Sequence, residues 1–165
     1  MNKFYYLFNT INGDFMSLYD IMSKNIIVGS VDDGIYEIAS IMKENDIGFV
    51  PIARDDKIVG VITDRDIVVK IISNHDYNSN ITNYMTKDIV DVSIDSSLSD
   101  VLNIMKKYRV KRVLVTDDNH VLGIVSISDF LNCNMDDEVL SCIKEIFEVG
   151  PNIHKYETEI DEFYL

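Results

Sequence analysis

The chain repeats one pattern at a fixed offset of 63 residues, and this repeat most limits what the chain can fold into. The same short motifs occur at both places: Met22-Ser23-Lys24 and Met85-Thr86-Lys87, Ile41-Met42-Lys43 and Ile104-Met105-Lys106, Gly60-Val61-Ile62-Thr63 and Gly123-Ile124-Val125-Ser126. An offset that stays constant through helices, strands and turns predicts one supersecondary unit used twice. We therefore expect a functional site that the two copies build together.

The size and hydrophobicity of the chain predict a globular protein. Its 165 residues, 47% of them hydrophobic, are enough to bury one compact core or two small ones. No run approaches the roughly 18 consecutive apolar residues that a membrane-spanning helix needs. The aromatic opening, Phe4-Tyr5-Tyr6-Leu7-Phe8, is too short and too poorly flanked for a signal peptide. The sequence thus predicts a cytoplasmic protein with no membrane partner.

The charge and the cysteines exclude further classes. A formal net charge of −13 argues against a nucleic-acid partner, because such surfaces need clustered Lys and Arg facing the phosphates. Over half of the acidic excess follows the repeats, where residues 133–165 carry nine acids and two lysines. Cys133 and Cys142 fit neither a CxxC motif nor a zinc knuckle, and the three histidines are scattered. We therefore expect reduced thiols and no metal site.

Each copy has the hydrophobic pattern of strand, helix, strand, strand and helix. In the first copy we expect a strand over Ile26 to Val31, a helix capped by Asp32 or Asp33 and ended by Gly48, hairpin strands Phe49 to Ala53 and Lys57 to Ile62 around Arg54-Asp55-Asp56, and a helix opened by Thr63. In the second copy we expect a strand from Ile89, a helix from Ser97 to Tyr108, hairpin strands Arg112 to Thr116 and Val121 to Val125, and a helix from Ile127.

These elements predict an α+β fold of two tandem β-α-β-β-α repeats packed about a pseudo-twofold axis. Helices cover only one face of a three-stranded sheet, so the other face keeps apolar surface exposed. We expect the sheet of the second copy to cover that face. We place the repeats at residues 17–75 and 80–132. Residues 1–16 form an N-terminal extension. Residues 133–165 contain an amphipathic helix over Asp136 to Glu148 and an acidic tail that suits a position along the domain.

A hydroxyl residue followed three positions later by an aspartate ends the same strand in both copies, as Thr63-x-x-Asp66 and Ser126-x-x-Asp129. This spacing is typical of a helix capping box, which by itself explains the motif. The same geometry also places a carboxylate at a helix N-terminus, a position that favours anions. There the carboxylate can accept hydrogen bonds from a ribose cis-diol, while the hydroxyl and the free amides bind a phosphate. In this second interpretation, the two motifs form equivalent binding sites that face one another.

The copies differ in charge close to these motifs. The first motif contains Arg65 where the second has Ser128, and residues 106–112 carry five positive charges in an otherwise acidic protein. We interpret the two lysines that begin this segment as the solvated face of a helix. Lys111 and Arg112 stand at the entrance of a strand, close to where the ligand phosphates of the other copy would lie. The candidate hydroxyl and phosphate contacts are therefore Thr63, Arg65, Lys111, Arg112, Ser126 and Ser128.

Together these motifs resemble a tandem pair of CBS domains, the module named after cystathionine beta-synthase. The resemblance covers about residues 17–132, through the Met-[Ser/Thr]-Lys motifs, the hairpin strands, and the endings Gly60 to Asp66 and Gly123 to Asp129. It implies clefts for adenosine-containing ligands such as AMP, ADP, ATP, S-adenosylmethionine or cyclic dinucleotides, bound as regulatory ligands and not as cofactors. It also implies a stand-alone module that forms a homodimer.

The resemblance also implies roles for individual residues. Asp66 and Asp129 match the family's ribose-binding acid, and Thr63 and Ser126 match its hydroxyl partner. The adenine pockets would be lined by Ile26, Ile27 and Ile62 in one repeat and by Ile89, Val90 and Val125 in the other, residues that are equally explained as core. The chain departs from the family pattern at Leu114, which replaces the proline represented by Pro51, and at Ile127-Ser128, which lacks the charges of Asp64-Arg65. We therefore expect the two clefts to differ in phosphate affinity.

Three classes of function remain open at this point. The leading hypothesis is a non-catalytic regulatory module, a sensor of cellular energy state, that binds an adenine nucleotide and transmits its occupancy to an unknown partner protein or to its own oligomeric state. The alternative is a ligand-free structural or interaction module in which both motifs are only caps. An enzyme is the weakest hypothesis, because the sequence has no GxxxxGK[ST] loop, no GxSxG motif and no Cys/His/Asp constellation.

Overall fold

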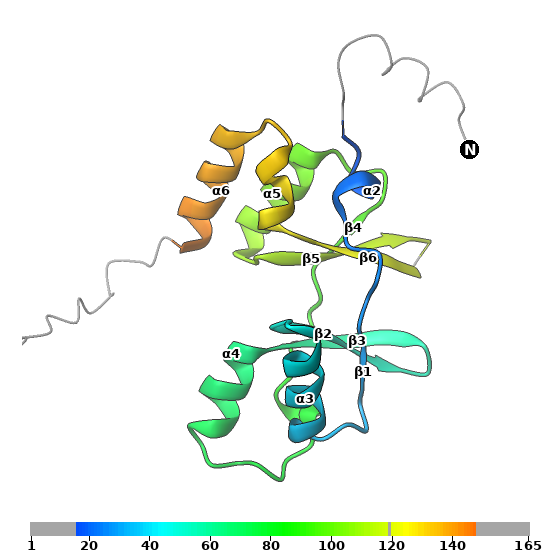
Figure 1. Cartoon of the computed structure of the whole chain (residues 1–165), viewed down its shortest axis with the longest axis vertical. Coiled ribbons are helices and arrows are strands. Elements are labelled where there is room, and N and C mark those ends of the chain that lie inside the picture. Colours follow the sequence, from blue (N-terminus) through cyan, green and yellow to red (C-terminus); the bar gives the residue numbers. More distant parts are fainter. Residues whose placement is uncertain (1–15, 119, 148–165) are drawn as a thin grey trace, which may run out of the picture.

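The computed structural model describes residues 16–118 and 120–147. Two three-stranded sheets, one from each repeat, face each other across the middle of the molecule, and helices cover their outer sides (Figure 1). The predicted α+β fold of two β-α-β-β-α repeats is confirmed. Among the described residues, no helix has both the length and the apolar character needed to cross a membrane. The predicted extension up to residue 15 and the predicted tail after Phe147 lie outside the described residues.

The repeats match each other element by element. The first contains β1 (Gly29–Ser30), α3 (Ile35–Asn45), β2 (Phe49–Arg54), β3 (Lys57–Thr63), α4 (Asp64–Asp66) and the π-helical segment η1 (Ile67–Ile72). The second contains β4 (Asp91–Ser93), α5 (Leu98–Tyr108), β5 (Arg112–Asp117), β6 (His120–Ser126) and the 3-10 helix η3 (Ile127–Asn132). Three further helices are α2 (Leu18–Ile21), η2 (Ile81–Asn83) and α6 (Asp136–Phe147). The repeats diverge after the last strand, where α4 runs into η1 but η3 stops before α6.

The sheets have the same topology and nearly the same register. In each, the first strand is parallel to the second, and the second and third form an antiparallel hairpin. The first hairpin turns through Asp55 and Asp56, whose φ angles are 48° and 60°. Positive φ at both central residues is the requirement of a tight type I′ turn, which matches the twist of the flanking strands. The short polar turn predicted between the strands is therefore confirmed.

The ends of α3 and α5 correct one prediction. Gly48 does not end the first helix; Asp46 takes the left-handed conformation with φ of 52°, and Arg109 does so at the corresponding position with φ of 53°. Their N–H groups donate to carbonyls of the last helical turn, which ends each helix. Gly48 has a different local role, because a Cβ atom there would lie 2.6 Å from Oδ2 of Asp64 and that side chain would have to move.

The start of α3 also differs from the prediction. Neither Asp32 nor Asp33 is its N-cap; the helix begins at Ile35, after Gly34. The carboxylate of Asp33 instead accepts the N–H of Ser30 at 2.7 Å, which holds the turn that leads into the helix. In the second repeat, the predicted cap is present, since the Ser97 hydroxyl accepts the N–H of Asp100.

The first strand of each repeat is shorter than its apolar run predicts. The run from Ile26 to Val31 forms only the two-residue β1, and the run from Ile89 begins to pair as β4 only at Asp91. Residues 23 and 86, a few positions before each strand, pair instead with the edge strand of the opposite repeat. β-branched composition predicts a strand, but it does not predict where the chain enters the sheet.

Each repeat has its own core, and each core includes residues from the opposite repeat. Leu18 and Met22 begin the first repeat but are buried in the core of the second. Ile81 and Met85 begin the second repeat but are buried in the core of the first. We call residues 18–24 and 81–87 the crossing segments. In Figure 1, the first of them, with α2, lies beside the second repeat.

Short antiparallel pairings fix the crossing segments to the edge strands. The N–H of Ser23 donates to the carbonyl of Ile124 at 2.9 Å, and the N–H of Ile124 returns a hydrogen bond at 3.0 Å. Thr86 and Val61 form the same pair in the other half, at 2.8 and 2.9 Å. These residues belong to the Met-[Ser/Thr]-Lys motifs and to the strand endings, so both repeated motifs have a structural role.

Gly60 and Gly123 make room for this approach. A Cβ atom on Gly123 would lie 2.7 Å from Sδ of Met22 and 2.9 Å from the carbonyl oxygen of Ser23. A Cβ atom on Gly60 would lie 2.6 Å from Sδ of Met85 and 3.0 Å from the carbonyl oxygen of Thr86. Because one of the two contacted atoms is backbone in each case, a side chain at either glycine would displace a crossing segment.

Candidate functional site

The first hydroxyl–acid motif is a complete capping box at the junction of β3 and α4. The Oδ2 atom of Asp66 accepts the N–H of Thr63 at 2.9 Å and its hydroxyl at 2.7 Å. The N–H of Asp66 in turn lies 3.2 Å from the Thr63 hydroxyl oxygen. Strand geometry at Thr63, followed at once by helical residues, brings the hydroxyl and the carboxylate together.

The second motif has the same geometry at the junction of β6 and η3. The Oδ2 atom of Asp129 accepts the N–H of Ser126 at 2.7 Å and its hydroxyl at 2.8 Å. The hydroxyl oxygens of Ser126 and Ser128 are 2.7 Å apart. Both motifs therefore use the Oδ2 atom of the aspartate for the cap. The Oδ1 atom takes no part in either cap.

The two aspartates differ at that other oxygen. Oδ1 of Asp66 forms an ion pair with Nζ of Lys70 at 2.7 Å. The residue at the corresponding position of the second repeat is Cys133, whose Sγ lies 3.5 Å from the carbonyl oxygen of Asp129. Among the described residues, Asp129 forms no ion pair. The repeats thus present one carboxylate that is paired with a cation and one that is not.

Burial raises the pKa of Asp66, but the hydrogen bonds from Lys70 and Thr63 outweigh burial and hold the pKa below the ordinary value of an aspartate. A depressed pKa means that the ionised carboxylate stabilises the folded state above the unfolded-state pKa of about 3.9. This contribution is lost as the pH falls through the lower, folded-state pKa.

We therefore expect Asp66→Asn to be less stable than the wild type at pH 7, by up to about 1 kcal/mol. The difference should shrink below about pH 4, where the carboxylate of the unfolded chain takes up a proton, and it should vanish once the pH has fallen through the lower folded-state pKa. Urea unfolding at several pH values between about 2 and 7 measures both quantities. Equal acid sensitivity of the two proteins would contradict the assignment.

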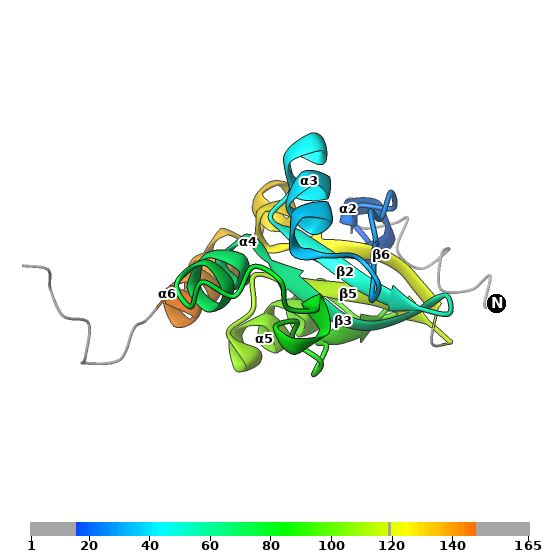
Figure 2. The same ribbon diagram turned by 90° about the horizontal axis from the view of Figure 1, so that it is seen from below.

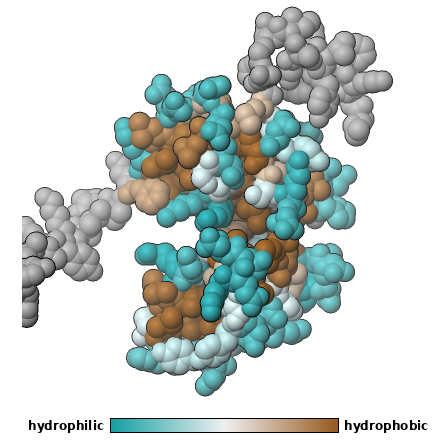
Figure 3. Space-filling view, in the orientation of Figure 1, coloured by the Kyte–Doolittle hydropathy of each residue, from teal (hydrophilic) through white to brown (hydrophobic). Residues whose placement is uncertain are grey.

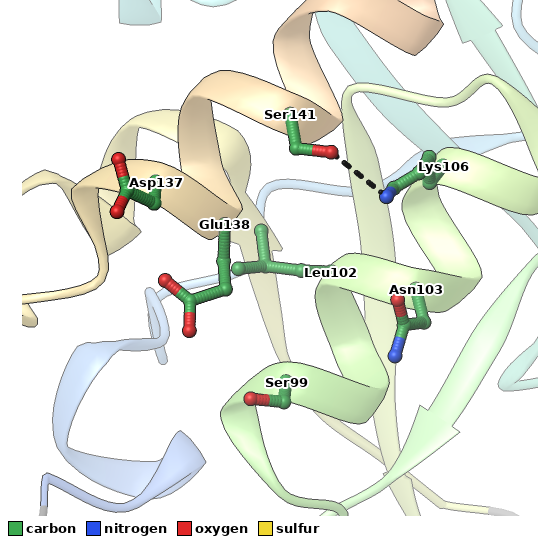
Figure 4. Close-up of a pocket in the computed structure, with 7 residues that line it drawn as sticks. All are labelled: Ser99, Leu102, Asn103, Lys106, Asp137, Glu138 and Ser141. Atoms are coloured by element: carbon green, nitrogen blue, oxygen red, sulfur yellow. Dashed lines mark hydrogen bonds between the residues drawn. The ribbon is translucent and has the colours of Figure 1, made fainter.

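The basic segment contacts the C-terminal helix α6. Nζ of Lys106 donates to the Ser141 hydroxyl at 3.0 Å, in a shallow hollow between α5 and α6 (Figure 4). Nζ of Lys111 lies 4.2 Å from the centre of the Phe147 ring. The Arg109 guanidinium lies 3.7 Å from the Glu145 carboxylate. Three of the five cations in this segment therefore contact α6, and Lys106 is not simply the solvated lysine that the sequence predicts.

Lys111 and Arg112 lie beside the hydroxyl–acid motif of their own repeat. The carbonyl of Lys111 accepts the N–H of Ile127 at 3.0 Å, and Arg112 pairs with Ser126 across the β5–β6 hairpin. Arg112 is exposed, as is Arg65 beside the first motif. The structure thus brings cationic side chains to both motifs, with Arg65 at the first and Arg112 at the second.

The apolar residues predicted to line the pockets fall into two groups. Ile62 and Val125 are fully buried in the cores of their repeats, as the core interpretation of the sequence predicts. The other four are half-buried and precede the first strands: Ile26, Ile27, Ile89 and Val90. These four are the ones that retain surface for contact with a ligand.

The comparison with protein families decides the assignment. The family model described as CBS domain matches residues 18–73 and 81–136. The chain belongs to the CBS domain family. One relative is the protein YlbB of Bacillus subtilis, which is 35% identical over 113 residues, 67% of this chain and 76% of the relative. Another is hypoxic response protein 1 of Mycobacterium tuberculosis, 31% identical over 130 residues, 77% of this chain and 91% of the relative.

A solved structure resembles this CBS pair over most of its length. It is the CBS domain pair of protein MJ0100 in complex with 5′-methylthioadenosine and S-adenosyl-L-methionine. The match has a TM-score of 0.65 and 31% identity, and it covers 71% of this chain and 94% of that one. The ligands of that protein both contain a ribose that bears an adenine.

Sequence reasoning missed two features of this CBS pair. Lys70 lies four residues after Asp66 on one helical face, a spacing at which opposite charges pair, so the signal was present in the sequence. The exchange of crossing segments between the CBS repeats had no local signal, because it joins residues far apart in the chain. In the described residues, no group of three or more His, Cys, Asp or Glu side chains is arranged to hold a metal ion.

Proposed function

We propose that this CBS pair is a non-catalytic regulatory module of the cytoplasm that binds adenosine-containing ligands at its two hydroxyl–acid motifs. In this proposal, Asp66 and Asp129 accept the ribose hydroxyls, and the half-buried residues before β1 and β4 contact the adenine. The motif hydroxyls serve the phosphate, together with Ser128, Arg65, Lys111 and Arg112. Occupancy is passed to a partner protein or to the oligomeric state through the different affinities of two conformations.

The observation that carries this proposal is the duplicated motif beside cationic side chains. Both acids are held in fixed positions by two cap hydrogen bonds, so a diol that binds them meets an already ordered carboxylate. The similar CBS pair in complex with two adenosine derivatives supports the same ligand class. Phosphate affinity is expected to differ between the motifs, because Arg65 and Ser128 differ.

Isothermal titration calorimetry with a ligand panel tests the proposal. The panel contains AMP, ADP, ATP, S-adenosylmethionine, 5′-methylthioadenosine and cyclic di-AMP, with inosine monophosphate as the control for the adenine amino group. At about 100 μM protein, we expect heat from at least one adenosine-containing ligand. No heat from any member of the panel would reject ligand binding. Incubation of each ligand with the protein, followed by chromatography, tests for the turnover that an enzyme would show.

The second candidate is a structural module whose motifs serve only as caps. The specific observation in its favour is that both boxes are complete without a ligand, and that Asp66 also has a cation partner. A cap of this kind contributes about 1 kcal/mol to stability, which is reason enough for its presence. Substitutions of the two aspartates separate the candidates.

We further propose that a second copy of the chain covers one side of the molecule. Large apolar side chains are exposed there on η1, η3 and α6: Val68, Val69, Ile72, Leu131, Leu140 and Phe147. Val68 and Leu131 are equivalent positions of the two repeats, so both repeats contribute to this apolar side, and an isologous dimer would bury the same side of each copy. α4 and α6 lie on the same side in both ribbon views, and apolar surface covers this side in each repeat (Figures 1 to 3).

Val68→Glu is expected to weaken dimer formation at least about tenfold, because the glutamate would be buried without a partner in the interface. Light scattering combined with size-exclusion chromatography over a dilution series measures the shift. Tyr36→Glu is the matched control, since Tyr36 is also exposed, at 67% against 57% for Val68, but lies on α3, away from this side. A wild-type protein that is monomeric at all concentrations, or equal effects of both substitutions, would reject the proposed face.

A further inference from the structure

The two ribose-binding aspartates of the proposed function are equivalent in their caps but differ at one oxygen atom. In both, Oδ2 accepts two hydrogen bonds from the capping residue. A carboxylate has two oxygens with about four acceptor positions in total, and a cis-diol uses it best when both oxygens are free to accept. The oxygen that matters for a second hydroxyl is therefore Oδ1, which the cap does not use.

In the first repeat, Oδ1 already has a strong partner. Nζ of Lys70 lies 2.7 Å from it, and the same Nζ donates to the carbonyl of Tyr84 at 3.2 Å. Two acceptors on different parts of the chain hold the ammonium group in place, so the lysine is not free to leave without losing both contacts. A diol that binds Asp66 must compete with this ammonium group.

In the second repeat, no cation occupies the equivalent place. Position 133 is a cysteine, its Sγ faces the backbone carbonyl of Asp129, and Asp129 forms no ion pair among the described residues. Its carboxylate is only partly exposed, yet its Oδ1 atom has no competing ammonium group. At the residue that could pair with Oδ1, the repeats thus differ by a lysine in one and a cysteine in the other, at equivalent positions of the 63-residue period.

We infer that Lys70 is a specificity-determining residue that occupies the acid of the first repeat, so that adenosine-containing ligands bind first and more tightly at Asp129. This inference rests on the proposed function. It assigns to Lys70 the role of a competitor that a ligand displaces, and not that of a ligand contact. A ligand at Asp66 therefore releases the ammonium group from its ion pair.

The contact of Lys70 with Tyr84 connects the competition at Asp66 to the second crossing segment. Tyr84 directly precedes Met85 and Thr86, and Lys70 contacts its carbonyl. Met85 is buried in the first core, and Thr86 pairs with Val61. Displacement of Lys70 from Asp66 thus acts on a residue within the second crossing segment, which links occupancy of the first site to the connection between the repeats.

Reciprocal substitutions at positions 70 and 133 test the inference. The probe is 5′-methylthioadenosine, which has the diol and the adenine but no phosphate, so direct attraction between lysine and phosphate does not contribute. Calorimetry on the wild type should show tighter binding at the site that Asp129→Ala removes. Lys70→Met should strengthen the Asp66 site about two- to fivefold, the range of a partly exposed ion pair, and leave the Asp129 site unchanged.

Cys133→Lys should weaken the Asp129 site by a similar factor, and Cys133→Met controls for side-chain length without charge. Thermal unfolding of each variant checks that the fold is intact. The inference is overturned if Lys70→Met leaves the Asp66 site unchanged or weakens it, or if the wild type binds only through Asp66. Wild-type binding with no effect of either exchange rejects the role of Lys70 alone. Absence of heat from the wild type and all variants, with this probe and with every member of the ligand panel, rejects the proposed function together with it.

Discussion

Gly123→Ala is expected to lower the free energy of unfolding by about 2 to 3 kcal/mol, because the added methyl group would push the first crossing segment away from β6. The methyl carbon would lie 2.9 Å from a backbone oxygen of Ser23, which is held by paired hydrogen bonds to Ile124. Relief of this contact must therefore weaken those hydrogen bonds or the packing of Met22. Urea unfolding at neutral pH measures the loss.

Gly34→Ala is the matched control for this substitution. A Cβ atom there would meet only Oε2 of Glu37, the far end of a flexible side chain that can turn away. We expect Gly34→Ala to change stability by less than about 1 kcal/mol. Gly60→Ala should behave like Gly123→Ala, because its contact with Thr86 is equivalent. If all three substitutions have the same small effect, the crossing segments do not pack against the edge strands as described.

Asp129→Ala is expected to weaken binding of an adenosine-containing ligand at the second motif by about a hundredfold or more. The reason is that two hydrogen bonds from ribose hydroxyls to a carboxylate are lost, each worth about 1.5 to 3 kcal/mol. The substitution also removes a cap, so the protein should lose about 1 kcal/mol of stability. Calorimetry measures the first effect and urea unfolding the second.

Asp129→Asn separates binding from capping. An asparagine side chain keeps a carbonyl oxygen that can accept the N–H of Ser126, so most of the stability should return. It lacks the negative charge, so binding should stay weak. Stability loss without any change in ligand affinity for both Asp129→Ala and Asp129→Asn would favour the structural module over the regulatory one.

Local elements were predicted well from the sequence, because their signals lie within a few residues of one another. The turn at Asp55 and Asp56 and the capping boxes at Thr63 and Ser126 depend on residues two or three positions apart. The amphipathic spacing of α6 likewise gave its bounds to within one residue. The spacing did not indicate which surface α6 covers, because a stripe of apolar residues says nothing about its partner.

Non-local features could not be predicted in the same way. The apolar run from Ile26 suggests a full strand, whereas pairing of Ser23 with the opposite repeat leaves only two residues to β1. Gly48 looked like a helix end because glycine tolerates the left-handed region, yet Asp46 takes that role and Gly48 relieves contact with Asp64. The spacing of Lys70 and Asp66 indicates an ion pair. That the two carboxylates differ follows only from the comparison with Cys133, the equivalent residue of the second repeat.

Because of the exchange of crossing segments, the unit that is duplicated in the sequence is not the unit that folds. The first residues of each sequence repeat belong to the core of the other repeat. The first half of the molecule closes when Val61 meets Thr86, about 25 positions apart, whereas the second closes only when Ser23 meets Ile124, about 100 positions apart. Loop-closure entropy and synthesis order both favour the first half. We therefore expect the first half to fold before the second. The crossing segment 18–24 is synthesised early, but it can pair only after β6 has been made.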